Sequence, residues 1–176
     1  MTASKNFGGC VKKIRMAALS LFAFVSLIPS GFAQVDAKLA DAVKHAKVSL
    51  DAGLKASERE GKPISGKFEL DEGKLQLSVY TEKASKFYEV VVDHTSGKIA
   101  KTEEITSGDD LTAAKAQSAA MARAKKSLRQ AVRDAQKTHK GFRAVSVVPE
   151  EKDSHPVATV TLTKDHETRT ATEKLD

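Results

Sequence analysis

The sequence predicts an α+β fold made of two tandem units, each a helix packed on a small antiparallel β-meander. Three observations lead to this prediction. The first 33 residues have the order of a signal peptide, so the folded part begins near residue 34. Apolar residues recur at steps of three and four over two long segments, 35–60 and 111–138. After each of these segments the apolar spacing changes to two, which is the period of half-buried strands.

The signal peptide is predicted from charge and hydropathy. Four basic residues and no acidic residue precede the apolar run 16–28, as in the n-region and h-region of an export signal. Pro29 ends the run, and Gly31 and Ala33 supply the small side chains that a signal peptidase accepts, so we expect cleavage between Ala33 and Gln34. The run is shorter than the roughly 20 apolar residues that span a bilayer, which favours a cleaved signal over an anchor.

Composition restricts the chemistry of the mature chain. Cys10 precedes the apolar run, whereas a lipid-modified cysteine would follow it, which makes a lipid anchor the disfavoured interpretation. Cys10 is the single cysteine of the sequence, so the chain has no cysteine after cleavage. This excludes disulfides, thiolate metal sites and cysteine nucleophiles. Of the 29 basic residues, four leave with the signal, which leaves 25 against 23 acidic residues. That balance does not favour a nucleic-acid partner.

The first predicted unit covers residues 34–106. Its helix ends at Gly61 and Pro63, and four strands follow with turns at 71–73 and 94–97. The apolar stripe of the helix consists of Leu39, Val43, Ala46, Leu50 and Leu54.

The second predicted unit covers residues 110–176, after a linker at 106–109. Asp109 or Asp110 is suited to cap a helix that runs to Thr138, because a carboxylate accepts hydrogen bonds from unpaired helical N–H groups. Gly141 stops that helix. Three strands follow, over about 142–148, 157–163 and 168–175.

The two units align in sequence as well as in pattern. Residues 47–57 align with residues 125–135, and residues 90–103 can be laid over residues 160–173. Two matches in the same order indicate an internal repeat.

One segment of the first unit resembles a known family. Tyr88-Glu-Val-Val-Val-Asp-His-Thr-Ser-Gly-Lys-Ile99 is similar to the stretch Y-E-V-x-V-D-x-x-x-G-x-V of the PepSY domain. The resemblance covers residues 39–105 well and residues 111–175 weakly, where Ala158-Thr-Val-Thr-Leu-Thr163 replaces the Tyr-Glu-Val core. It implies an extracytoplasmic module, found in protease propeptides and stand-alone envelope proteins, for which peptidase inhibition has been proposed. The family has no catalytic residues or cofactor to carry over.

The sequence contains no motif typical of an enzyme. None of the five histidines is paired at helical metal-ligand spacing, and there is no His-Glu-x-x-His, Gly-x-Ser-x-Gly or phosphate-binding glycine loop. A metal site assembled from His155, Asp165 and His166 is an alternative, but solvated loop residues are the favoured interpretation. We therefore expect neither catalysis nor a bound cofactor.

Two sets of residues are candidates for contact with a partner. Strand alternation places Tyr80 and Phe87 on the sheet face opposite Val79, Tyr88 and Val90. There they form either an exposed contact patch or a surface packed against the second unit, and the packed alternative is favoured.

The second set is basic. Lys125, Arg129, Arg133 and Lys137 are spaced four apart, as a stripe along one side of a helix that can meet an anionic surface. The alternative, which we favour, is a solvated face that complements the helix dipole.

Together these patterns predict an exported, periplasmic or extracellular, non-catalytic module that binds a protein, with a peptidase as the candidate partner. A strand edge or a sheet face would enter the peptidase cleft. Charged residues on the candidate edges, Lys98, Lys101, Arg169 and Lys174, oppose strand addition. The rival is an envelope protein whose basic helix binds anionic lipid or polymer. The sequence does not indicate an oligomeric state.

Overall fold

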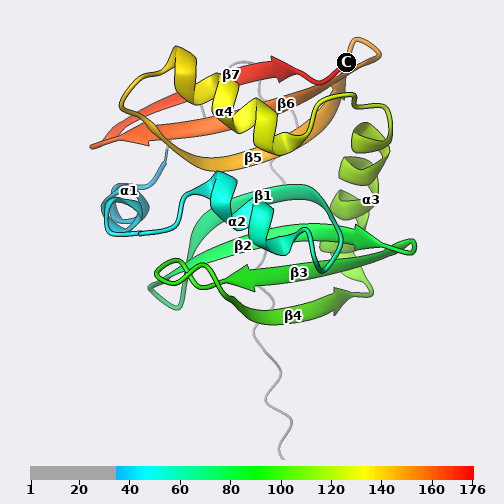
Figure 1. Cartoon of the computed structure of the whole chain (residues 1–176), viewed down its shortest axis with the longest axis horizontal. Coiled ribbons are helices and arrows are strands. Elements are labelled where there is room, and N and C mark those ends of the chain that lie inside the picture. The colour runs from blue at the N-terminus through cyan, green and yellow to red at the C-terminus, as the bar shows by residue number, and fades with distance from the viewer. Residues whose placement is uncertain (1–34) are drawn as a thin grey trace, which may run out of the picture.

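The computed structural model describes residues 35–176, so the predicted signal peptide and its cleavage point at Ala33 and Gln34 lie outside the described residues. The α+β class is confirmed: four helices accompany one antiparallel sheet of seven strands, ordered β4-β3-β2-β1-β5-β6-β7 (Figure 1). In chain order the elements are α1 Ala37–Lys44, α2 Leu50–Ser57, β1 Lys62–Asp71, β2 Lys74–Lys83, β3 Lys86–Val92, β4 Ile99–Ile105, α3 Gly108–Ala122, α4 Leu128–Thr138, β5 Arg143–Lys152, β6 His155–Lys164 and β7 Glu167–Lys174.

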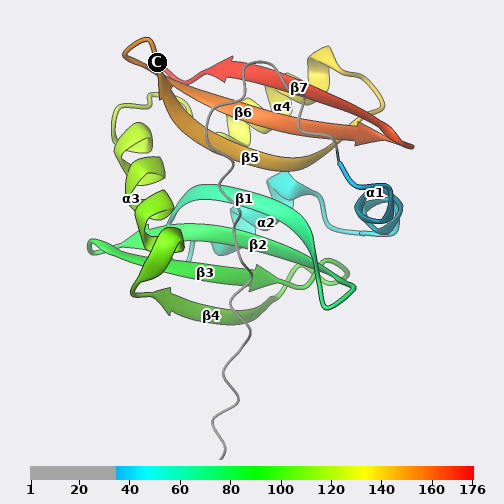
Figure 2. The same ribbon diagram turned by 180° about the vertical axis from the view of Figure 1, so that it is seen from behind.

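The helices lie on both faces of the sheet. Helices α2 and α4 cover the face that we call the front, and α3 lies on the opposite, back face (Figures 1 and 2). Gly66 allows the close approach of α2 to β1, because a Cβ atom there would lie 3.2 Å from Leu54. On the back face, Ser65 of the same strand donates a hydrogen bond to Gln117 of α3.

Each long helix predicted from the sequence is two helices in the structure. The first break falls between α1 and α2, where the N–H groups of Lys47 and Val48 both donate to the carbonyl of His94, at 3.0 and 2.9 Å. Ser49 then caps α2 by accepting a hydrogen bond from the N–H of Ala52. The helical periodicity of 35–60 did not reveal this break, because its acceptor lies far away in the sequence.

The second break, between α3 and α4, has the same construction. The N–H groups of Lys125 and Lys126 donate to the carbonyl of Leu175, and Ser127 caps α4 through the N–H of Gln130. The break allows α3 and α4 to lie on opposite faces of the sheet. The aligned segments 47–57 and 125–135 therefore have matching local geometry.

The PepSY-like segment makes the turn that fixes the first break. The carboxylate of Asp93 accepts hydrogen bonds from the N–H groups of Thr95 and Ser96, and Gly97 takes a φ of +75°. The hydrogen bond from the Ser96 backbone is the main reason why the pKa of Asp93 is below its usual value. This turn positions the carbonyl of His94 toward Lys47 and Val48.

The sheet is continuous across the predicted unit boundary. Strands β1 and β5 pair through Gly66 with Val147 and Lys67 with Ser146. One cluster of buried apolar side chains includes Leu54 and Val90 from the first predicted unit and Leu162 from the second. The described parts of the two predicted units, residues 35–106 and 110–176, thus share one sheet and one core.

Candidate functional site beneath α3

The back face of the sheet is polar where α3 lies on it. Strand alternation and register place Ser65, Lys67, Ser78, Tyr80 and Glu89 together on this face. Cross-strand pairing sets Tyr80 beside both Ser65 and Glu89. A cavity lies between this polar face and α3.

The cavity between α3 and the sheet has a volume of about 330 Å³. Strands β1, β2 and β5 form its floor and α3 forms its wall. Apolar atoms, those of the Tyr80 ring among them, make up most of the lining surface, although several of the lining side chains carry polar groups. The lining residues are Ser65, Gly66, Lys67, Tyr80, Asp109, Asp110, Ala113, Ala114, Gln117, Ser146 and Val148.

Tyr80 supplies the cavity with a hydroxyl that stays protonated. Burial raises the pKa of Tyr80 far above its usual value, and the charges of Glu89, Glu69 and Asp110 raise it further. The Lys67 ammonium lies 5.7 Å from the centroid of the Tyr80 ring. Tyr80 can therefore donate a hydrogen bond to a bound group.

A network of polar side chains supports the floor of the cavity. The Ser78 hydroxyl donates to Glu69 at 2.8 Å and accepts from the amide of Gln76 at 2.9 Å. Lys67 pairs with Glu69 at 2.7 Å. Burial raises the pKa of Glu89, which is the carboxylate next to Tyr80.

The two predicted contact residues differ in their surroundings. Both lie on the back face, as alternation predicts, but Phe87 is only 8% exposed and belongs to the core. Tyr80 is half-buried and lines the cavity. They do not form an exposed patch together, and the packed alternative describes Phe87.

Sequence reasoning missed the opening of the cavity. Val148 is 40% exposed, and no other large apolar side chain among residues 35–176 is classed as exposed. The two adjacent valines, Val147 and Val148, were the available signal, because successive strand residues point to opposite faces and only one of the two can lie on the front face. The prediction that Asp109 or Asp110 caps the helix is wrong: Ser107 is the N-cap residue, and both aspartates lie in the first turn of α3 and line the cavity.

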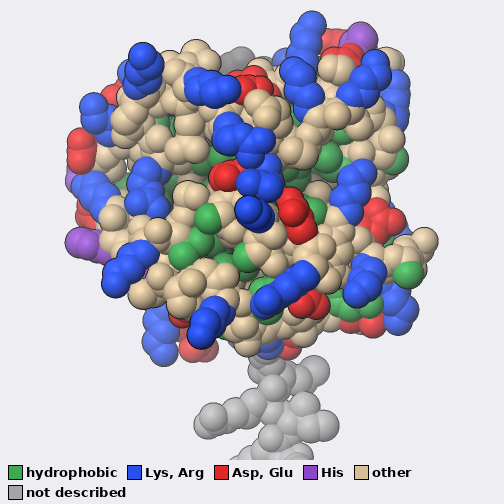
Figure 3. Space-filling model, viewed as in Figure 1, with side chains coloured by type: hydrophobic (Ala, Val, Ile, Leu, Met, Phe, Trp, Pro, Cys, Tyr) green, Lys and Arg blue, Asp and Glu red, His purple; other side chains and the backbone are tan. Residues whose placement is uncertain are grey.

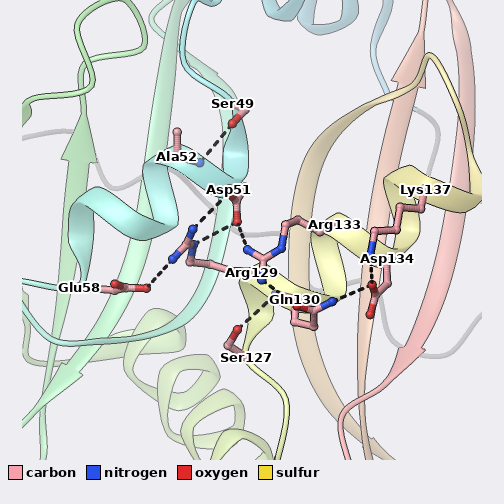
Figure 4. A network of polar contacts seen from close by, with 10 residues as sticks. All are labelled: Ser49, Asp51, Ala52, Glu58, Ser127, Arg129, Gln130, Arg133, Asp134 and Lys137. Atoms are coloured by element: carbon pink, nitrogen blue, oxygen red, sulfur yellow. Dashed lines mark hydrogen bonds and ion pairs between the residues drawn. The ribbon is translucent and has the colours of Figure 1, made fainter.

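The predicted basic stripe is not a free cationic surface. Arg129 contacts Asp51 of α2 through Nε and Nη2 at 3.0 and 3.3 Å, and Arg133 Nη1 contacts the same carboxylate at 2.9 Å (Figure 4). Arg129 also reaches Glu58 at 3.4 Å. These pairs join α2 to α4 and neutralise part of the stripe.

The other two members of the stripe do not extend it. Lys125 precedes α4, in the break after α3, so it does not lie on the same helix. Lys137 pairs with Asp134 at 3.4 Å. Figure 3 shows basic and acidic side chains interspersed over this side of the molecule.

The histidines considered for a metal site have separate partners. His155 contacts Asp176 at 2.6 Å, and His166 lies 3.9 Å from Asp41. Within residues 35–176, no group of three or more potential ligands could hold a metal ion. No helix in this part of the chain has the length and apolar character needed to cross a membrane.

Comparison with known proteins identifies no family. No family model matches the chain, and no curated protein matches it. A match among solved structures is a crystal structure of a "putative lipoprotein" from Clostridium difficile 630, which is 16% identical. The match covers 70% of this chain and 81% of that chain with a TM-score of 0.37. The PepSY resemblance therefore stays a prediction from the sequence.

Proposed function

We propose that this chain is an exported, non-catalytic module that binds a protein through the cavity beneath α3, and that its partner is a peptidase. The cavity carries the proposal: it is lined mainly by small and apolar groups, and Val148 exposes an apolar surface at its lining. Such a cavity has the shape and chemistry to receive one apolar side chain.

The polar groups of the cavity select what stands next to that side chain. Asp109 and Asp110 are acidic and lie in the first turn of α3. They favour a basic residue on the partner by charge complementarity. The Tyr80 hydroxyl is placed to donate to a main-chain carbonyl of the inserted segment. We therefore expect the partner to present an apolar residue flanked by lysine or arginine.

Two features of the sequence supply the rest of the proposal. Residues 1–33 predict export, and the PepSY resemblance implies a role in peptidase inhibition. We assign the contact to the sheet face rather than to a strand edge, because the cavity lies on the face and because the charged side chains of β4 oppose pairing with a strand that lacks complementary charges.

The test is capture of envelope and secreted proteins on the processed chain, followed by a peptidase assay on what is retained. Ala113→Leu fills the cavity and should weaken retention and inhibition by roughly tenfold or more. Ala116→Leu, on an exposed position of the same helix, is the matched control and should leave both unchanged. Equal effects of the two variants, or retention of no peptidase, would count against the proposal.

We also propose that the chain consists of two related units, although they share one core. The serine caps Ser49 and Ser127 follow identically constructed breaks. Register shifts occur between Pro63 and Ser65 in β1 and between Ala144 and Ser146 in β5. In this correspondence β3 of the first unit is equivalent to β7 of the second, since the carbonyls of His94 and Leu175, which follow these strands, each accept the two N–H groups of a helix break. The predicted alignment of 90–103 with 160–173 instead superposes β4 on β7.

A second candidate function is the binding of anionic lipid or polymer, and a hollow at the break between α3 and α4 supports it. It measures about 550 Å³, and four cations line it, Lys62, Lys125, Lys126 and Arg129, with Glu58 as the acidic group. Lys62 donates to the carbonyl of Met121, and Arg129 is held by Asp51. Co-sedimentation with anionic vesicles at low and high salt tests this function. Binding that weakens with salt and with Lys125→Glu would favour it over peptidase binding.

A further inference from the structure

Strand β4 forms one edge of the sheet, and no other strand of the described residues pairs with its outer side. Its central residues, 100–104, are all exposed. It pairs with β3 and, among residues 35–176, with no other strand. The opposite edge is different, because the N–H of Val35 donates to Thr168 of β7 at 3.1 Å and brings the start of the described chain against that strand.

Two residues of opposite charge flank Thr102 in the middle of β4, and Glu104, the other charged residue of the strand, pairs with Lys86 of β3. Lys101 and Glu103 flank Thr102 and lie on the same sheet face, where they pair with each other at 2.8 Å. If two copies of β4 run antiparallel about Thr102, each Lys101 lies opposite the Glu103 of the other copy. A twofold axis perpendicular to the sheet produces this arrangement and keeps both back faces on the same side.

Charge also selects this register over its neighbours. The neighbouring registers that keep both back faces on the same side of the joint sheet are those in which the twofold axis passes through Lys101 or Glu103 in place of Thr102. Centring on Lys101 places two lysines directly opposite each other, and centring on Glu103 places two glutamates opposite each other. Like charges in opposed positions destabilise an antiparallel pair, whereas opposite charges stabilise it.

We propose that β4 is a contact between two copies of this chain, paired antiparallel about Thr102 so that one sheet continues through both. This proposal does not rest on the cavity or on a peptidase partner. The register shift between Val91 and Val92 interrupts regular β4 geometry near Ala100, which limits the paired length. A short contact buries little area, so the association is reversible and depends on concentration.

Sedimentation equilibrium of the processed chain over a wide concentration range tests the proposal. The wild type should associate, and Lys101→Glu or Glu103→Lys should each weaken association roughly tenfold or more, since either change turns two attractive pairs into two repulsive ones. The double variant K101E/E103K restores both pairs and should recover association. Both side chains are half-exposed, so thermal unfolding should confirm an unchanged fold.

The opposite edge supplies the matched control. Arg169 and Glu167 of β7 form a similar exposed pair, with a contact of 2.8 Å. Arg169→Glu should leave association unchanged. A monomeric wild type at the highest concentration would overturn the proposal. So would single exchanges without effect, a double exchange that does not recover association, or loss of association with Arg169→Glu.

Discussion

The two faces of the sheet are built from alternate residues of the same strands, yet they have different roles. On the front face, Leu77, Val79 and Val90 are completely buried beneath the helices. On the back face, the neighbouring positions hold the buried Ser78 and the half-buried Glu89, and a cavity lies between this face and α3. The front face therefore accounts for most of the stability, and the back face leaves polar groups and a cavity available to a partner.

Truncation of adjacent residues of β2 should give the largest measurable difference between the faces. Leu77→Ala removes a fully buried front-face side chain and should lower the free energy of unfolding by about 3–4 kcal/mol. Ser78→Ala removes hydrogen bonds to Glu69 and Gln76 on the back face and should cost about 1 kcal/mol. Urea denaturation of both variants measures the difference. Similar losses would show that the back face contributes to stability as much as the core does.

The ion pairs between α2 and α4 test whether the front layer also depends on charge. Asp51→Ala leaves Arg129 and Arg133 without their shared carboxylate and should lower the free energy of unfolding by about 1–2 kcal/mol. Glu58→Ala removes only the longer contact to Arg129 and is the matched control, with an expected loss below about 0.5 kcal/mol. Equal losses in urea titrations would mean that Asp51 is not the centre of the network.

The local spacing of apolar residues predicted the strands, their faces and the turns. The helix breaks, the ion pairs and the cavity depend on contacts between residues far apart in the sequence, and the spacing did not predict them. Alternation placed Tyr80 and Phe87 on the correct face, and the turn at 94–97 is where the sequence predicted it. The helix breaks depend on the carbonyls of His94 and Leu175, which no helical period encodes. The stripe residues Arg129 and Arg133 pair with the carboxylate of Asp51, which is more than 70 residues away in the sequence. The cavity depends on where α3 crosses the back face, which follows from the second break.

The protonation of Glu89 gives the smallest expected effect and the sharpest test of the back face. Burial, with a further contribution from the charge of Glu69, raises the pKa of Glu89 above its ordinary value of 4.5. The folded chain thus binds this proton more tightly than the unfolded chain does. The contribution of Glu89 to stability is therefore most favourable at low pH and declines as the pH rises through the two pKa values.

Replacement of Glu89 by glutamine should remove that decline. Glu89→Gln should be more stable than the wild type at about pH 7, and its advantage should vanish at about pH 4, where both states of the wild type hold the proton. Urea denaturation at the two pH values measures the change. An advantage that is the same at both pH values would mean that packing, and not ionisation, distinguishes Glu89 from glutamine. The polar back face would then carry no electrostatic cost for a partner to relieve.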